Sequence, residues 1–284
     1  MELMKVNKPV SGEKTAGNPK GGAFHLIKEG PSTLLEVRNL TKYYKDVKAL
    51  SNVSFSIDKG EFVAVIGPSG SGKTTMIRCI NRLINSSSGT ISYNKLDMLK
   101  LGKKNLRQAR AKLGMIFQHY NLVNRLTVIE NVLHGRLGYK STMAGVFGIY
   151  TESEKRKAVE VLGLLGLEDF IYRRCDQLSG GQMQRVGIAR ALIQDPRMIL
   201  CDEPISSLDP SSAKVIMDYL KKVQVEFGIT ILVNLHQVDV AKKYAKRILG
   251  FNSGEIVFDG PPSQLTRDII YKIYGAETGD MVHD

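Results

Sequence analysis

One glycine-rich segment constrains the fold of this chain more than any other. It fits the phosphate-loop pattern G-x-x-x-x-G-K-[ST] and runs Gly67, Pro68, Ser69, Gly70, Ser71, Gly72, Lys73, Thr74. The apolar run 61–66 before it predicts a buried strand, and residues 74–81 after it predict a helix with an apolar face. A strand, a glycine loop and a helix in this order predict an α/β core with a nucleotide site at the loop.

The residue types in the loop suit the binding of phosphate. Glycines and small residues let successive backbone N–H groups turn toward phosphate oxygens, and the helix N-terminus adds partial positive charge. Lys73 can reach the β- and γ-phosphates, and the Thr74 hydroxyl can ligate Mg²⁺. We therefore expect residues 67–74 together with Thr75 to hold the nucleotide.

Composition and charge limit the class of protein. The chain has 284 residues, of which 43% are hydrophobic and 24% charged, as in a globular protein, and no apolar run approaches the length of a membrane span. No secretory signal is visible, so we expect a cytosolic chain. The net charge of +12 is compatible with nucleic acid or an anionic membrane. Because no basic block with interleaved aromatic residues is present, membrane proximity or simple solubility is favoured.

The cysteines indicate no zinc site, and the remaining patterns indicate one nucleotide-binding core with a helical insertion. Cys79, Cys175 and Cys201 have no C-x-x-C spacing, so neither a zinc site nor a disulfide framework is indicated. The patterns predict strands at 34–37, 53–57, 89–94, 198–201 and 230–234, a turn at 42–45, helices at 152–165, 184–193 and 210–227, and a hairpin within 247–259. The segment 138–150 has no assignable pattern.

Two carboxylates follow the apolar strand Met198–Cys201. Asp202 stands where a phosphate-loop protein places the carboxylate that holds Mg²⁺. Glu203 follows at once, at the carboxyl end of the strand, where α/β sheets bind ligands. A carboxylate there can accept a proton from a water molecule that attacks the γ-phosphate.

A second phosphate-binding device precedes the helical run that begins near Gln184. Its residues are Leu178, Ser179, Gly180, Gly181 and Gln182. Small residues at a helix N-terminus form an anion site, although one nucleotide needs only one complete cradle. The surplus indicates that this loop acts on a nucleotide held by a second copy of the chain.

Taken together, these segments resemble the motifs of ABC transporter ATPase subunits. The resemblance rests on Gly67–Thr74, on Leu178–Gln182, and on Cys201-Asp202-Glu203-Pro204 followed by Ser207-Leu208-Asp209, and it covers about residues 34–265. It implies an α/β fold: a P-loop NTPase ABC ATPase core with an antiparallel β subdomain and an α-helical subdomain inserted at about 97–190. Residues 1–33 are then expected to be a disordered tail and 266–284 a C-terminal extension.

The resemblance also implies roles for single residues. Tyr44 would stack on adenine, with Tyr43 as the close alternative. Gln118 would touch Mg²⁺ and the attacking water, in a loop that faces the membrane subunits. Asp209 would bridge two subunits, and His236 would contact the γ-phosphate as the switch histidine. The implied reaction is hydrolysis of ATP with Mg²⁺ at the interface of a head-to-tail dimer.

Local sequence narrows the type of transporter that the resemblance suggests. The segments 131–138 and 234–239 are similar to those of phosphonate importer ATPases, including relatives that carry phosphite. This implies separate permease subunits, a solute-binding protein acting through them, a peripheral location on the cytoplasmic face of the membrane and no nucleic acid. An importer of amino acids or another small solute is an alternative, and a non-transport ABC ATPase is a more distant one.

Overall fold

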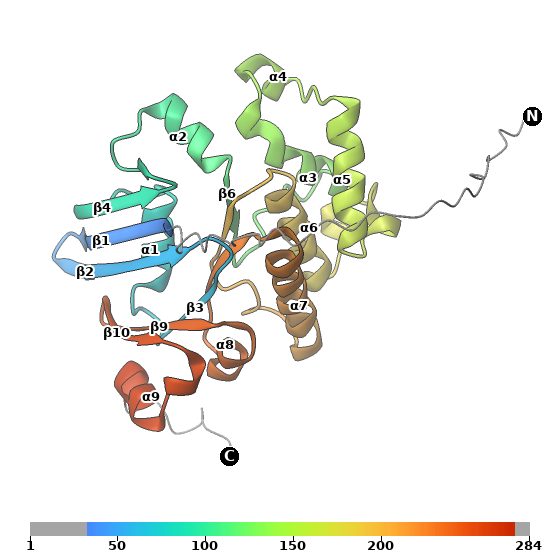
Figure 1. Ribbon diagram of the computed structural model, residues 1–284. Helices are drawn as coiled ribbons and strands as arrows, with labels where there is room; N and C mark the ends of the chain where they lie inside the picture. Colours follow the sequence, from blue (N-terminus) through green and yellow to red (C-terminus); the bar gives the residue numbers. More distant parts are fainter. Residues whose placement is uncertain (1–32, 276–284) are drawn as a thin grey trace, which may run out of the picture. The chain divides into compact units, whose positions relative to one another are not determined.

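The computed structural model describes residues 33–275, which contain two β-sheets and a separate lobe of helices (Figure 1). The larger sheet has six strands in the order β10-β9-β3-β8-β7-β6. Strands β9, β3, β8, β7 and β6 are parallel, and β10 pairs antiparallel with β9. The strands are β3 (Phe62–Ile66), β6 (Leu113–Ile116), β7 (Met198–Cys201), β8 (Thr230–Asn234), β9 (Arg247–Asn252) and β10 (Glu255–Gly260).

The smaller sheet is antiparallel, with the order β2-β1-β4-β5. Its strands are β1 (Thr33–Tyr44), β2 (Val47–Asp58), β4 (Ser88–Tyr93) and β5 (Leu96–Asp97). Val37 of the central strand β1 pairs with Phe55 on one side and with Ile91 on the other. All three side chains are buried, so one face of this sheet belongs to the core.

Strand β3, which leads into the phosphate loop, is covered on both faces. Val63 and Val65 belong to a core that contains helix α1 (Lys73–Ile80) and the inner face of the small sheet. Phe62, Ala64 and Ile66 belong to the core on the opposite face, with the helices packed there. The alternation follows from the period of a strand, and burial of all five residues is typical of a central parallel strand.

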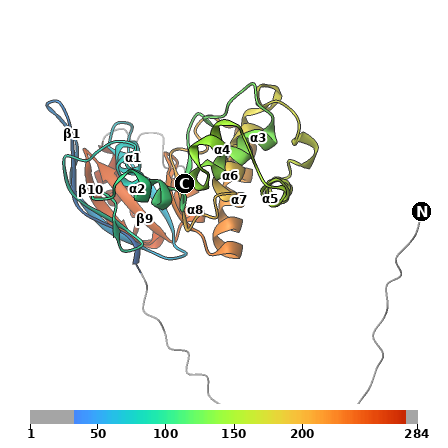
Figure 2. The same ribbon diagram turned by 90° about the horizontal axis from the view of Figure 1, so that it is seen from above.

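The helical lobe lies beside the sheets in both views (Figures 1 and 2). It contains α3 (Val128–Leu133), η1 (His134–Tyr139), α4 (Thr142–Val146), α5 (Glu152–Leu164) and α6 (Gly180–Leu192). The other helices are α2 (Lys103–Arg110), α7 (Pro210–Phe227), α8 (Val238–Tyr244) and α9 (Arg267–Tyr274), with short turns η2 (Glu168–Phe170), η3 (Cys175–Gln177) and η4 (Pro262–Gln264). No helix within 33–275 is both long and apolar enough to cross a membrane.

The predicted fold class is confirmed, and most predicted elements are present. The strands at 198–201 and 230–234 and the helix at 210–227 have the expected bounds. The turn predicted at 42–45 is wrong, because β1 continues to Tyr44, which pairs with Val47, and the chain turns after it. Aromatic residues favour a strand, and this preference outweighs the flanking lysines.

The domain bounds and the termini are described only in part. The range 97–190 also contains β6, which pairs with β7 in the large sheet, so the uninterrupted helical part begins at α3. The tail expected over 1–33 lies outside the described residues except for Thr33, and so do residues 276–284. The described part of the C-terminal extension forms α9. All three cysteines are buried and free.

Candidate active site

The phosphate loop needs glycine at two positions. Gly67 has a φ of +152°, and a Cβ atom there would lie 2.2 Å from the carbonyl oxygen of Phe251. Gly72 has a φ of +106°, and its Cβ would lie 2.6 Å from the carbonyl oxygen of Ala49. Gly72 is also the residue that begins helix α1. The loop can therefore fold tightly against β9 and β2 only without side chains at these positions.

The Lys73 side chain folds back onto the backbone of the phosphate loop. Its Nζ donates hydrogen bonds to the carbonyl oxygens of Gly67 at 2.8 Å and of Pro68 at 2.9 Å. Burial lowers the pKa of Lys73, while the carboxylates of Glu203 and Asp202 raise it. Carbonyl oxygens are neutral acceptors, so charged phosphate oxygens would be stronger partners for this amine.

Asp202 is the buried centre of the site. Its Oδ1 accepts hydrogen bonds from the Thr74 hydroxyl at 2.7 Å and from the Asn234 side-chain amide at 3.1 Å. The Arg78 Nε lies 3.8 Å from its other oxygen. The structure thus brings together the predicted Mg²⁺ ligands Thr74 and Asp202, which are 128 residues apart in the sequence.

Glu203 and His236 contact each other at the same edge of the sheet. The His236 Nε2 lies 2.6 Å from the Glu203 Oε1. Glu203 has a φ of +53°, which is unusual for a residue with a long side chain and is common at functional sites. His236 follows β8 and Glu203 follows β7, which are neighbours in the sheet. The residues predicted to be the base and the switch histidine are therefore in direct contact.

Gln118 is brought to this edge by the next strand. Ile116 of β6 pairs with Cys201 of β7, and its carbonyl oxygen accepts a hydrogen bond from the Asp202 backbone at 2.9 Å. Gln118 lies two residues beyond Ile116 and is half-buried. It therefore lies at the carboxyl ends of the strands, where Asp202 and Glu203 also lie.

The second predicted phosphate-binding segment, 178–182, is not hydrogen-bonded to the phosphate loop within the described part of one copy of the chain. Ser179 begins helix α6, accepting a hydrogen bond from the Gln182 backbone at 3.3 Å, while the Gln182 side chain accepts one from the Ser179 backbone at 2.8 Å. A Cβ at Gly180 would lie 2.9 Å from the Tyr120 hydroxyl, and one at Gly181 3.1 Å from the Ser212 hydroxyl. Within residues 33–275, no hydrogen bond or ion pair joins 178–182 to 67–75.

The remaining predicted residues lie near the surface. Asp209 begins helix α7 and accepts backbone hydrogen bonds from Ser211 and Ser212, both at 3.0 Å. Hydrogen bonds from the same two serines hold the pKa of Asp209 well below its usual range. Tyr43 and Tyr44 are both 46% exposed, so their burial does not distinguish them, and adenine stacking by Tyr44 remains a prediction.

Two residues of this edge were not singled out by sequence reasoning. Asn234 is fully buried, and its Nδ2 holds Asp202, while its Oδ1 has no partner among the described residues. The sequence signal for Asn234 is that this polar residue follows the apolar run 231–233 at the end of β8. Tyr274 of α9 donates a hydrogen bond from its hydroxyl to the His236 carbonyl oxygen at 3.1 Å. Nothing in the local sequence indicates that contact.

A phosphate loop, an Asp–Glu pair and a histidine at one edge of a parallel sheet define a P-loop nucleotide-hydrolysing protein. A sequence profile described as ABC transporter matches residues 50–206. The chain belongs to the ABC transporter family, as an ATP-binding cassette.

Similar proteins of known name or structure cover most of the chain. The "Phosphonates import ATP-binding protein PhnC 2" of Oceanobacillus iheyensis is 61% identical over 251 residues, which are 88% of this chain and 99% of that protein. PhnC of Treponema denticola is 50% identical over 84% of this chain and 94% of its own length. A dimeric post-hydrolysis structure of the cassette MJ0796 with ADP and Pi has a TM-score of 0.71 at 37% identity, covering 80% of this chain and 98% of that one.

Proposed function

We propose that this chain hydrolyses ATP to drive import of a phosphonate, or of a related reduced-phosphorus anion, through separate permease subunits. The ATPase role is supported by one arrangement beside the phosphate loop: Thr74 contacts Asp202, and Glu203 contacts His236. The solute class is supported by 61% identity to a protein named for phosphonate import, over 99% of its length.

Binding of ATP would complete the phosphate loop. The Lys73 amine would exchange the carbonyl oxygens of Gly67 and Pro68 for oxygens of the β- and γ-phosphates. The Ser71 hydroxyl is buried and has no partner among the described residues, so it is an available donor within the cradle. Tyr44 would cover the adenine.

The residues at this edge also fit Mg²⁺. The Asp202 carboxylate and the Thr74 hydroxyl are hard oxygen ligands that already touch each other, with Gln118 on the same sheet edge. Residues 33–275 contain no group of three or more His, Cys, Asp or Glu side chains able to hold a metal ion alone. Mg²⁺ binds through few protein ligands and through substrate phosphates, and it would neutralise developing phosphate charge.

Hydrolysis would use Glu203 and His236 as a pair. The Glu203 carboxylate would accept a proton from the water that attacks the γ-phosphorus, while the bond from that phosphorus to the β–γ bridging oxygen breaks. ADP and inorganic phosphate result. The His236 imidazole, now 2.6 Å from Glu203, would bind a γ-phosphate oxygen and so place the phosphate beside the base.

A second copy of the chain would complete each site. The N-terminus of α6, capped by Ser179 and Gln182, offers backbone N–H groups to an anion but has no link to the phosphate loop of its own chain. Ser179 and Gly181 of one copy would contact the γ-phosphate held by the other, with Asp209 at the joint. The dimeric structures of MJ0796 support this assembly.

The helical lobe offers a surface for permease subunits. Met143, Val146, Phe147 and Ile149, on and after α4, are each at least 60% exposed. A groove of about 900 Å³ adjoins them, lined in part by Tyr150 and Tyr172. Exposed apolar patches of this kind mark interaction sites. In this proposal the chain lies on the cytoplasmic face of the membrane, a solute-binding protein acts through the permease, and no nucleic acid is involved.

The test is the hydrolysis of ATP by the chain reconstituted with its permease and binding protein. Methylphosphonate, phosphite, phosphate and an amino acid are added separately, and Glu203→Gln is the control for turnover by this site. We expect stimulation by methylphosphonate or phosphite and almost no turnover with the variant. Stimulation by the amino acid alone would exclude the solute assignment, and near-normal turnover by Glu203→Gln would exclude Glu203 as the base.

A further inference from the structure

The C-terminal helix α9 reaches the active site through a single hydroxyl group. Tyr274, the last residue of α9, is 4% exposed, and its hydroxyl donates a hydrogen bond to the His236 carbonyl oxygen at 3.1 Å. The His236 side chain in turn lies 2.6 Å from Glu203. Helix α9 is therefore two contacts away from the proposed base.

The Tyr274 hydroxyl is a donor in its contact with His236. Burial raises the pKa of Tyr274 to about 12, and the Gly67 backbone partly opposes this rise. A phenol with this pKa keeps its proton near pH 7, so it donates to the His236 carbonyl oxygen at 3.1 Å.

Helix α9 holds this hydroxyl in a fixed place. A Cβ atom at Gly250 of β9 would lie 2.4 Å from the Ile273 Cδ1, so the helix packs directly onto the bare backbone of that strand. Gly250 pairs with Ile66, the residue before the phosphate loop. The Asn252 side chain also donates to the Lys272 carbonyl oxygen at 3.0 Å. The helix is therefore anchored to the strand that borders the loop.

We propose that Tyr274 is a positioning residue for His236: its hydroxyl holds the His236 backbone in place so that the imidazole meets the γ-phosphate. The inference rests on the proposed role of His236. Helix α9 then serves the hydrolysis of ATP, not only the packing of the C-terminus.

The test replaces the hydroxyl and keeps the ring. Tyr274→Phe is compared with Tyr271→Phe, which makes the same change on the same helix at a side chain that is 59% exposed. Affinities for ATP and for ADP are measured in the Glu203→Gln background, where ATP is not consumed, and kcat and KM in the wild-type background. Because His236 acts on the γ-phosphate, Tyr274→Phe is expected to weaken ATP binding and lower kcat about five-fold, the effect of one hydrogen bond, and to leave ADP binding unchanged.

A double-mutant cycle tests whether Tyr274 affects ATP binding through His236. His236→Ala removes the imidazole but keeps the backbone carbonyl that Tyr274 binds, so Tyr274→Phe should have no further effect on ATP affinity in that variant. Three results would each overturn the inference. Tyr274→Phe could weaken binding of ATP and ADP equally, its effect on ATP affinity could add to that of His236→Ala, or it could leave both ATP affinity and kcat unchanged. If His236→Ala itself hydrolyses and binds ATP normally, the proposed role of His236 falls as well. If only Tyr274→Phe is normal, the inference alone falls.

Discussion

At the scale of single residues, Asn234 is the group that orients the buried carboxylate of the site. Its Nδ2 donates to Asp202, and its Oδ1 is buried without a partner among the described residues. Such a half-satisfied amide costs stability, and its one side-chain hydrogen bond among the described residues is with Asp202. We predict that Asn234→Leu, of similar shape, leaves the melting temperature unchanged or higher and raises the Mg²⁺ concentration for half-maximal hydrolysis about 10-fold.

The matched control for this prediction lies at the other end of the same strand. The Thr230 hydroxyl accepts a hydrogen bond from the Gly60 backbone at 2.9 Å, far along β8 from Asp202. Thr230→Val should lower the melting temperature without changing the Mg²⁺ requirement. An unchanged Mg²⁺ requirement in Asn234→Leu would show that the amide does not act on the metal site.

The residues of the site differ in how far the sequence could predict them. Lys73, Thr74, Asp202 and Glu203 follow from local patterns, because each stands directly after a recognisable buried strand or glycine loop. Tyr274 could not be predicted in this way. Its contact with His236 spans 38 residues and depends on the packing of Ile273 against Gly250, which no periodicity encodes.

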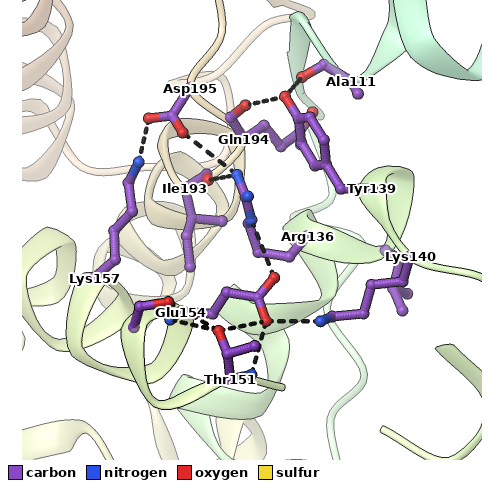
Figure 3. Close-up of polar contacts among 12 residues, drawn as sticks. Ala111, Arg136, Tyr139, Lys140, Thr151, Glu154, Lys157, Ile193, Gln194 and Asp195 are labelled. Carbon is purple, nitrogen blue, oxygen red and sulfur yellow. Dashed lines mark hydrogen bonds and ion pairs between the residues drawn. The ribbon is translucent and has the colours of Figure 1, made fainter. Parts of the chain in front are cut away.

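At the scale of elements, α5 is tied to the rest of the helical lobe by Glu154 (Figure 3). Burial would raise the pKa of Glu154, but hydrogen bonds from Lys140, the Thr151 backbone and Arg136, together with the charge of Lys140, lower it to about 2. Arg136 also donates to Asp195, which binds Lys157 (Figure 3). Glu154 therefore joins η1 to the start of α5, and Arg136 extends the network to the loop before β7.

The lowered pKa predicts how stability depends on pH. A carboxylate with an ordinary pKa near 4.3 when unfolded and about 2 when folded stabilises the protein above pH 4. This contribution is lost as the pH falls from about 4 to about 2. Glu154→Gln should lower the free energy of unfolding by about 2 kcal/mol at pH 7, measured by urea denaturation, and the difference from wild type should shrink on acidification.

The control for this element is a second glutamate on the same helix. Glu152 pairs with Lys155 at 2.8 Å, but its side chain is 74% exposed. Glu152→Gln should leave the free energy of unfolding nearly unchanged, because solvent screens an ion pair this exposed. Equal effects of the two variants would show that the buried network does not fix α5.

The sequence predicts helix α5 but not the segment 138–150 before it. Helix α5 is predicted by its apolar spacing, with Ala158, Val161 and Leu162 buried on one face. The segment before it has no such spacing, and the end of η1 is held by a side chain of α2. Arg107 of α2 donates to the carbonyl oxygens of Gly138 and Leu137, both at 3.0 Å. Such long-range contacts leave no local pattern.

At the scale of the whole molecule, each site should combine two copies of the chain. In the proposed symmetric dimer the phosphate loop of each copy would meet the α6 N-terminus of the other. Lys73→Ala removes the phosphate-binding amine. Gly181→Asp places a negative charge in the first turn of α6, which suits the helix itself but repels the γ-phosphate. We expect each variant alone to lack turnover.

Mixing the two inactive variants should restore hydrolysis, because the mixed dimer concentrates both defects in one site and leaves the other intact. At a 1:1 ratio half of the dimers are mixed, so about a quarter of the wild-type number of sites is functional. Turnover is measured against the mixing ratio and should peak near equal amounts. Gly181→Asn, which has nearly the same shape without the charge, should keep more turnover than Gly181→Asp. If mixed dimers form, as shown by cross-linking, and remain without turnover at every ratio, the two loops do not act on one nucleotide across the interface.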